Sequence, residues 1–392
     1  MIPAPQPSRR PERGRSNGRP FHVLYLSGSF PPRIGGLETM GAELAAGLAG
    51  RGHRVTVVTE SMDAGAGPLM LDGVDIHRRD FLAALDARDV GRIATLRGEL
   101  IAMAAAIEPD VVHVAFSPMT AYYALGARLH DMAPVVLTFY AWWPEIGRPG
   151  GTVTRRAVEA ADWVIACSEA TLGEVRASFP QVAARSSVVH NALDHPHDAP
   201  PGGQPMPPVV VAAGHLREDK GFDVLIEAFR AVHARFPGAR LLLAGDGPDR
   251  VALEEAARPL GDAVQFLGWA MPEAMPSLLE RSAVVAVPSR AEAFGLVALE
   301  AALRARPVVA SAVGGLPEVV DAPATGLLVG PDDPEALADA ICELLGDPAR
   351  AARMGTAAQA RARTLFTPDR FLEAHERIYE RVTPHTPAEA NL

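Results

Sequence analysis

The stretch Phe21–Thr59 reads FHVLYLSGSFPPRIGGLETMGAELAAGLAGRGHRVTVVT, and its hydrophobic pattern decides the fold class. An apolar run over Phe21–Leu26 predicts a buried strand, and the glycine and prolines that follow it predict a turn. A helix is expected over about Gly36–Ala49, and a second buried strand over Arg54–Thr59. A strand, a helix and a strand in this order predict a βαβ unit of a parallel sheet.

The same alternation continues on both sides of a proline-rich break. His195–Pro208 (HPHDAPPGGQPMPP) holds six prolines and two glycines among fourteen residues, which predicts a linker between two domains. Further strands are expected at Val111–Val114, Val135–Phe139, Trp163–Cys167, Ser187–His190, Val209–Ala213, Arg240–Ala244, Val264–Leu267, Ala283–Val287, Pro307–Ala310 and Gly326–Val329. Helices are expected between them, notably over Phe222–Phe236 and Leu296–Arg304.

The predicted fold is therefore α/β, with two Rossmann-like, doubly wound domains that face each other across a ligand cleft. The expected limits are a disordered tail at 1–20, an N-terminal domain at 21–194, the linker at 195–208, a C-terminal domain at 209–370, and a C-terminal helix at 371–392 that packs back on the N-terminal domain.

Composition narrows the function classes. A length of 392 residues favours two domains, and a formal net charge of −10 argues against a nucleic-acid partner. The two cysteines, Cys167 and Cys342, lie far apart, so we expect no disulfide framework and a cytoplasmic location. The chain has no apolar run of the roughly 18 residues that a transmembrane helix needs.

The segment Pro288–Ala301 (PSRAEAFGLVALEA) carries the strongest chemical signal. Its helix is apolar on every side except at Glu300, and a buried carboxylate without a partner costs about several kcal/mol, so Glu300 should meet donors such as two ribose hydroxyls. Glu292 precedes the helix. Backbone N–H groups near Phe294, Gly295 and Leu296 can face a diphosphate. A salt-bridged Glu300 and an exposed Glu292 are the purely structural alternative.

Lys220 is the only lysine in the chain, and it stands in GHLREDKGF (Gly214–Phe222), directly after a predicted strand. A lysine on such a loop can neutralise the charge that develops on a departing diphosphate. The alternative is an exposed surface lysine beside Asp219.

The loop Gly28–Gly36 (GSFPPRIGG) follows the first strand. Its glycines, Gly35 and Gly36 among them, let the backbone approach a ligand closely. It is not a dinucleotide fingerprint, because no G-x-G-x-x-G occurs here. A tight turn without a ligand is the alternative.

Taken together, these segments resemble glycosyltransferase family 4, the retaining nucleotide-sugar transferases of the GT-B fold. The resemblance runs from about Phe21 to Arg381, and its most specific element is the family's E-x7-E pair, Glu292 and Glu300. Matching segments also include GGLETMGAELAAGLAGRGHRVTVVT, PDVVHV, ADWVIACS, VVHNALD, RPVVASAVGGLPEVV and TGLLVGPDDPEALADAI.

The resemblance implies a role for each site residue. The N-terminal domain would bind the acceptor and the C-terminal domain the nucleotide sugar. Glu300 would hold the donor ribose, and Glu292 would contact the transferring sugar near its anomeric centre. Lys220 would bind the diphosphate with the amides at Phe294–Leu296, and Gly35 and Gly36 would lie against phosphate or acceptor. No metal and no cofactor beyond the nucleotide sugar are implied.

The chain departs from the family at two candidate catalytic positions. Many members carry a phosphate-binding arginine after the glycine at Gly214, where this chain has His215, and Arg217 stands two residues on as a substitute. Many members carry a histidine where this chain has Tyr140.

Tyr140 is the first residue of an aromatic group. Together with Trp142 and Trp143, beside Glu145, it could form an acceptor platform, because sugars and cyclitols stack on aromatic faces. Ordinary loop packing is the alternative. His113, on a predicted strand, is a candidate acceptor-side residue, with strand packing as its alternative.

The function expected is a retaining transfer of a hexose or amino-hexose from a nucleotide sugar to a small polar acceptor. UDP is the nucleotide expected from family frequency. An acidic protein would suit a cationic aminocyclitol, as in antibiotic biosynthesis. The sugar, the acceptor and the oligomeric state stay open.

Two other functions are weighed against it. A transferase at a membrane surface predicts a basic amphipathic stretch, for which Arg78–Arg97 is the nearest candidate, although three aspartates partly cancel its arginines. A catalytically inactive nucleotide-sugar binder would not need Glu292, Glu300 and Lys220 together.

Overall fold

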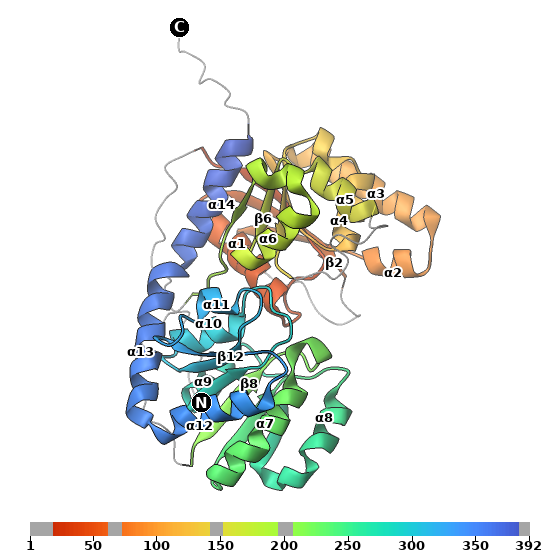
Figure 1. Ribbon diagram of the computed structural model, residues 1–392. Coiled ribbons are helices and arrows are strands. Elements are labelled where there is room, and N and C mark those ends of the chain that lie inside the picture. Colours follow the sequence, from red (N-terminus) through yellow and green to blue (C-terminus); the bar gives the residue numbers. More distant parts are fainter. Residues whose placement is uncertain (1–18, 62–72, 142–151, 195–206, 384–392) are drawn as a thin grey trace, which may run out of the picture.

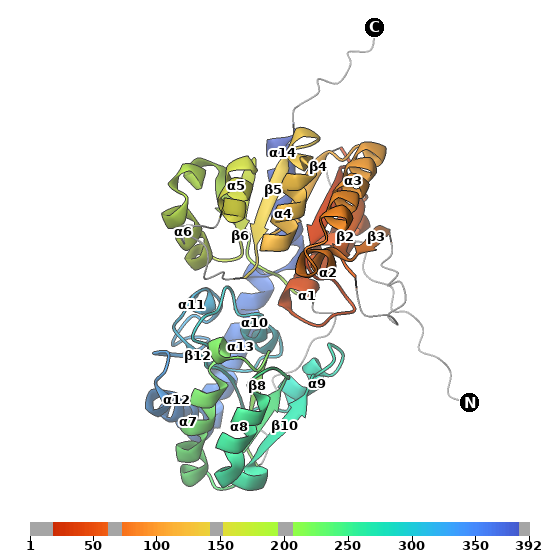
Figure 2. The same ribbon diagram turned by 90° about the vertical axis from the view of Figure 1, so that its right-hand side faces the viewer.

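The computed structural model describes residues 19–61, 73–141, 152–194 and 207–383. They form two α/β domains, drawn one above the other in Figures 1 and 2, with the N-terminal domain on top. Most of the predicted tail and linker, together with Trp142, Trp143 and Glu145, lie outside the described residues.

Within the described residues, the N-terminal sheet has seven parallel strands in the order β3-β2-β1-β4-β5-β6-β7. The strands are β1 (His22–Ser27), β2 (Arg54–Glu60), β3 (Val74–Arg79), β4 (Val111–Ala115), β5 (Val135–Phe139), β6 (Trp163–Ala166) and β7 (Ser186–Val188). The helices are α1 (Gly36–Gly50), α2 (Phe81–Asp86), α3 (Val90–Ile107), α4 (Pro118–Gly126), α5 (Thr152–Ala160) and α6 (Glu169–Ser178).

The C-terminal sheet repeats this order with six described strands, β10-β9-β8-β11-β12-β13. The strands are β8 (Val209–Ala213), β9 (Arg240–Ala244), β10 (Val264–Gly268), β11 (Val284–Val287), β12 (Val308–Ser311) and β13 (Gly326–Val329). The helices are α7 (Phe222–Arg235), α8 (Arg250–Ala257), α9 (Met275–Glu280), α10 (Leu296–Leu303), α11 (Leu316–Val319), α12 (Pro334–Gly346), α13 (Pro348–Leu365) and α14 (Pro368–Val382).

Both sheets are covered on their two faces, as parallel sheets require. In β1, Leu24 and Leu26 pack into one hydrophobic cluster and Val23 and Tyr25 into another, because successive side chains point to opposite faces. In each sheet the strand order reverses beside the first strand, between β1 and β4 and between β8 and β11. The loops at such a reversal are where α/β proteins bind ligands.

The last two helices run along one side of both domains (Figure 1). The first of them, α13, packs on α10 of the C-terminal domain, and α14 packs on α1 of the N-terminal domain. Thr367 caps α14 by accepting a hydrogen bond from the Arg370 amide at 3.3 Å, and Pro368 occupies its first turn.

The strand order confirms the predicted α/β class with two doubly wound domains, whereas the domain limits stay a prediction. Strand ends shift by one or two residues, and the predicted strand Ser187–His190 is in fact Ser186–Val188. The strand Val74–Arg79 was not predicted at all. Its sequence, VDIHRR, has little apolar character because β3 is a half-buried edge strand.

Candidate functional site

Two loops of the C-terminal domain meet beside the reversal between β8 and β11. One runs from Gly214 through Lys220 after β8, and the other runs from Pro288 to Gly295 after β11. Gly221 has a positive φ of 64°, and a Cβ atom there would collide with the carbonyl oxygen of Pro288. Glycine at this position therefore lets the two loops touch.

Lys220 and Glu292 form an ion pair across these loops, with the Lys220 Nζ 2.9 Å from a Glu292 carboxylate oxygen. Both side chains are partly accessible, at 26% for Lys220 and 18% for Glu292. The ammonium also lies 3.8 Å from Asp219. The structure thus brings together two residues that the sequence placed 72 positions apart. A diphosphate bound here could replace Glu292 as the ion-pair partner of the Lys220 ammonium.

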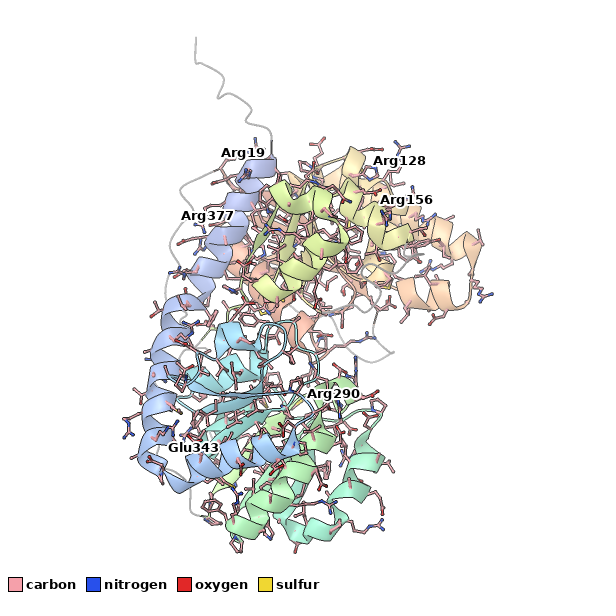
Figure 3. All side chains as sticks on the ribbon, in the orientation of Figure 1. Arg19, Arg128, Arg156, Arg290, Glu343 and Arg377 are labelled. Atoms are coloured by element: carbon pink, nitrogen blue, oxygen red, sulfur yellow. The ribbon has the colours of Figure 1, made fainter. Side chains whose placement is uncertain are left out.

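Arg290 fixes the loop that carries Glu292. Its guanidinium makes two hydrogen bonds to the Asp223 carboxylate, at 2.9 and 2.7 Å, and a third to Asp332 at 2.6 Å. The Arg290 amide donates to the Asp219 carbonyl at 2.8 Å, which ties this loop to the one that holds Lys220. Figure 3 shows Arg290 in the upper half of the C-terminal domain, the half on the side of the N-terminal domain.

Glu300 lies on α10 as a half-buried carboxylate, and no hydrogen bond from a described residue reaches it. Burial raises the pKa of Glu300 to about 7, against the opposing charge of Arg304. The Glu300 carboxylate thus has no hydrogen-bond donor to stabilise its ionised form, and hydroxyl groups of a ligand could be those donors.

The first turn of α10 has no side-chain cap. Its N-cap residue, Gly295, has a φ of 104°, and a Cβ atom there would come within 2.6 Å of Leu316. The backbone amides that follow Phe294 and Gly295, including that of Leu296, have no side-chain acceptor. Free amides at a helix start favour a bound anion.

The start of α1 reaches the start of α10. A Cβ atom added to Gly36 would lie 2.9 Å from a methyl group of Leu296, and Gly35 is the N-cap residue of α1. Each helix follows a strand of its own sheet, so the carboxyl ends of the two sheets face each other at this contact.

Glu318 joins the two domains, a role that the sequence did not predict. Its carboxylate accepts hydrogen bonds from the amides of Glu169 and Ala170 at the start of α6, at 2.9 and 3.1 Å, and lies 2.9 Å from His190 Nε2. Burial alone would raise the pKa of Glu318, but these bonds hold it below its ordinary value. The signal was present in the segment RPVVASAVGGLPEVV, but only the folded chain shows which amides the carboxylate meets.

A second contact between the domains holds the Glu292 loop. The carbonyl oxygen of Ala293, the next residue, accepts from Thr171 Oγ1 at 3.3 Å and from Cys167 Sγ at 3.6 Å. Both donors belong to the N-terminal domain. The position of Glu292 therefore depends on how the two domains are docked.

The three residues at or beside the two unusual positions, His215, Arg217 and Tyr140, lie in different surroundings. His215 is exposed and its ring lies 5.5 Å from that of Trp269, and Arg217 is exposed and paired with Asp219 at 2.9 Å. Tyr140 packs between the hydrophobic clusters of both domains. The Tyr140 hydroxyl has no hydrogen-bond partner among the described residues, and burial raises its pKa well above the ordinary value.

The prediction that His113 faces an acceptor is wrong. Its side chain is fully buried, and both ring nitrogens are engaged, Nδ1 with the Tyr379 hydroxyl at 2.6 Å and Nε2 with Thr138 Oγ1 at 2.7 Å. Tyr379 belongs to α14, which packs over His113 of β4. His113 is therefore a packing residue between β4 and α14.

The membrane-binding candidate Arg78–Arg97 is not a free basic face. It runs from the end of β3 through α2 into α3, and within it Arg79 pairs with Glu99 at 2.6 Å and Arg92 lies 3.7 Å from Asp80. Arg97 lies over the ring of Tyr122, 4.4 Å from its centroid. None of the helices in the described ranges combines the length and the apolar character of a membrane span.

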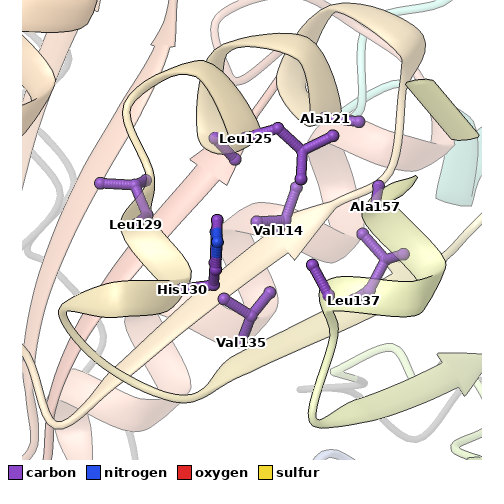
Figure 4. A pocket seen from close by; sticks show the side chains of 10 residues that line it. Val114, Ala121, Leu125, Leu129, His130, Val135, Leu137 and Ala157 are labelled. Atoms are coloured by element: carbon purple, nitrogen blue, oxygen red, sulfur yellow. The ribbon is translucent and has the colours of Figure 1, made fainter. Parts of the chain in front are cut away.

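Other possible ligand sites are sparse in the part of the chain that the structure describes. It contains no group of three or more histidine, cysteine, aspartate or glutamate residues that could hold a metal ion. A cavity of about 20 Å³ lies among α4, β4, β5 and α5 in the N-terminal domain, lined by residues such as Val114, Leu125 and His130 (Figure 4). That volume suits about one water molecule and not a sugar.

Comparison with known proteins matches each half of the chain to a family. Residues 34–196 match Glycosyltransferase Family 4, and residues 207–347 match Glycosyl transferases group 1. A glycogen synthase of Mycobacterium tuberculosis is 31% identical over 394 residues, which cover 92% of this chain and 94% of that protein.

Solved structures share the fold. Sucrose-phosphate synthase from Thermosynechococcus elongatus superposes with a TM-score of 0.79 at 24% identity, over 92% of this chain and 98% of that one. Anabaena HepE in complex with UDP and glucose superposes with a TM-score of 0.71 at 22% identity, over 92% of this chain and 99% of that one.

Proposed function

The chain belongs to glycosyltransferase family 4, and from that premise we propose that it moves a hexose or amino-hexose from a nucleoside-diphosphate sugar, UDP-linked, to a hydroxyl of a small polar acceptor. It is a glycosyltransferase of the GT-B fold. The proposal adds that the transfer retains the anomeric configuration and needs no metal. It supposes no cofactor other than the nucleotide sugar.

One observation carries the proposal: the 2.9 Å Lys220–Glu292 pair lies at the loop that leads into α10, the helix whose first turn has free amides and which carries the unpartnered carboxylate of Glu300. An ammonium with free amides suits a diphosphate, and a carboxylate without a donor suits the two hydroxyls of a ribose. These groups together match the polar parts of a nucleoside diphosphate.

The chemistry proposed is a displacement on one face of the sugar. The bond from the anomeric carbon to the diphosphate oxygen breaks as the acceptor oxygen bonds to that carbon, and the acceptor proton passes to the leaving phosphate. Lys220 neutralises the charge that grows on this phosphate, and Glu292 contacts the sugar near its anomeric carbon. Exposed His215 and Arg217 lie on the same loop as further contacts to phosphate.

Relatives and net charge bear on the nucleotide and the acceptor. UDP is favoured because HepE was solved with UDP and with UDP-glucose, and because UDP is frequent in this family. A net charge of −10 would favour a cationic aminocyclitol as acceptor, and a relative from Streptomyces kanamyceticus, 36% identical over 149 residues, is named alpha-D-kanosaminyltransferase. The local charges of the N-terminal domain favour an anion instead.

The test is nucleotide binding by the full-length protein. UDP, GDP, ADP and TDP are compared by thermal shift and calorimetry, since a ligand that binds only the folded state raises the melting temperature. We expect UDP to bind, and Glu300→Gln to weaken it about ten-fold or more, the usual effect of losing hydrogen bonds to a charged group. Glu343→Gln is the matched control, because Glu343 lies far from the N-terminal domain (Figure 3).

Two further measurements separate the alternatives. NMR of the product formed from the matching UDP-sugar gives its anomeric configuration, and an inverted product would overturn the retaining step. Binding without any transfer or donor hydrolysis would point to an inactive nucleotide-sugar binder. Failure of every nucleotide to bind would refute the proposal as a whole.

A further inference from the structure

Two arginines lie at the edge of the N-terminal sheet that faces the C-terminal domain. Arg33 stands in the loop between β1 and α1, and Arg78 is the last residue but one of β3. Because β1, β2 and β3 are parallel, their carboxyl ends share one edge of the sheet. The loop that holds Arg33 ends at Gly36, which contacts Leu296 of the C-terminal domain.

Only one of the two terminal nitrogens of the Arg78 guanidinium has a hydrogen-bond partner among the described residues. Its Nη2 donates to the carbonyl oxygen of Pro31, in the same loop as Arg33, whereas its buried Nη1 has no partner among the described residues. Arg33 donates to the carbonyl oxygen of Ser61 at 3.3 Å. Burial, reinforced by the charge of Arg33, lowers the pKa of Arg78 below its ordinary value. Two guanidinium groups are therefore held close together by neutral carbonyl oxygens.

Two carboxylates, Glu60 and Asp80, lie near this pair, and each is bonded to another group. Glu60, at the end of β2, accepts the Leu82 amide at 2.8 Å, and burial raises its pKa although the nearby charge of Arg33 opposes this shift. Asp80 lies 3.7 Å from Arg92. Within the described residues neither Arg33 nor Arg78 forms an ion pair with a carboxylate. Arg33 is exposed, whereas Arg78 is half-buried. A half-buried positive charge that has a second one beside it and no ion-pair partner is costly, and an anion would reduce that cost.

We propose that Arg33 and Arg78 bind a phosphate monoester on the acceptor, so that the acceptor is a phosphorylated sugar or polyol. This rests on the proposed transferase function. The planar guanidinium matches a phosphate group with paired N–H donors. The acceptor is favoured over the donor as the source of the phosphate, because Lys220, the α10 amides and Glu300 already provide for the donor from the opposite domain.

The placement also suits the reaction. A phosphate held at the end of β3 lies on the same edge as Gly36, where the N-terminal domain touches the start of α10. The hydroxyl-bearing part of the acceptor would then extend from the arginines toward the transferring sugar. The site thus sets the charge of the acceptor and its direction of approach.

The experiment measures inorganic phosphate and glucose 6-phosphate, with glucose as the neutral probe, against the full-length protein saturated with UDP. We expect both phosphates to bind by calorimetry and glucose to bind at least about ten-fold more weakly. Arg33→Met and Arg78→Lys should each weaken phosphate about ten-fold while leaving the affinity for UDP unchanged. Arg33 is exposed, so its replacement does not endanger folding.

Arg54→Met is the matched control, since Arg54 is exposed at the amino end of β2, on the opposite edge of the sheet. It removes one positive charge from the same domain and should leave phosphate binding intact. Phosphate that competes with UDP, or that binds equally well to both arginine variants, would overturn the acceptor site. UDP binding that survives in every variant would leave the proposed function standing, and its loss in the wild-type protein would refute that function separately.

Discussion

The two facing edges of the domains differ in how their charges are compensated. In the C-terminal domain, Lys220 is paired with Glu292, and Arg290 is bonded to Asp223 and Asp332. In the N-terminal domain, Arg33 and Arg78 are bonded only to carbonyl oxygens within the described residues. In the proposed function, the C-terminal or donor edge is organised before a ligand arrives, whereas the N-terminal or acceptor edge would gain its counter-charge from the ligand.

The largest effect should come from the donor edge. Lys220→Ala removes the charge that faces the leaving phosphate, and kcat should fall about 100- to 1000-fold, as when a transition-state hydrogen-bond donor is removed. Lys220→Arg keeps a positive charge and should recover part of the rate. Steady-state transfer or donor hydrolysis measures both. A Lys220→Ala enzyme that kept more than about a tenth of the wild-type kcat would show that the paired edge does not assist departure of the diphosphate.

The stability of the N-terminal domain should depend more on α14 than on the edge that faces the C-terminal domain. His375 on this helix is fully buried, and burial lowers its pKa to about 4. Because the unfolded value is 6.5, the neutral form stabilises the fold fully above pH 6.5, and this stability is lost as the pH falls from 6.5 to 4. The loss should approach about 3 kcal/mol.

Urea unfolding at pH 7.5, 6, 5 and 4 measures this loss, with His375→Leu as the variant that cannot titrate. The variant should lose less stability over this range than the wild-type protein. Parallel curves for the two proteins would assign the acid sensitivity to other groups, such as His113, whose pKa is also lowered by burial.

The pH dependence of nucleotide binding sharpens the comparison further. With a pKa of about 7, Glu300 is mostly protonated at pH 6 and mostly ionised at pH 8. The ionised form accepts from two ribose hydroxyls, so UDP should bind up to about ten-fold more tightly at pH 8 than at pH 6. Glu300→Gln should remove the part of this trend that Glu300 causes. An equal slope in the variant would trace the trend to the phosphates of UDP.

The smallest effect should come from the contact that joins the two edges. Glu318→Gln keeps one acceptor for the α6 amides but loses the charge that faces His190, so we expect kcat to fall about three- to ten-fold with little change in UDP affinity. Transfer kinetics and calorimetry give the two numbers. A loss of UDP affinity equal to the loss of kcat would mean that Glu318 acts on the C-terminal domain alone.

The sequence predicted what lies close to strand ends and failed where distant segments meet. Lys220 and Glu292 follow β8 and β11, which are neighbours in the sheet, so their proximity could be expected from the strand order. His113 was misplaced because Tyr379, 266 residues later, covers it. The role of Glu318 was missed because its partners belong to the other domain, and no local pattern records a contact of that range.

The path of α14 bears on how the protein is made. Leu372 packs against Gly47 so closely that a Cβ atom there would lie 2.6 Å from a leucine methyl group, and Glu376 pairs with Arg51 at 2.7 Å. The ribosome adds residues at about 5 to 20 per second, so the partners of α14 wait roughly 15 to 60 s for it to emerge. The strands and helices of the C-terminal domain are therefore synthesised before α14. The N-terminal domain is synthesised first, but it is the last to receive all its packing contacts.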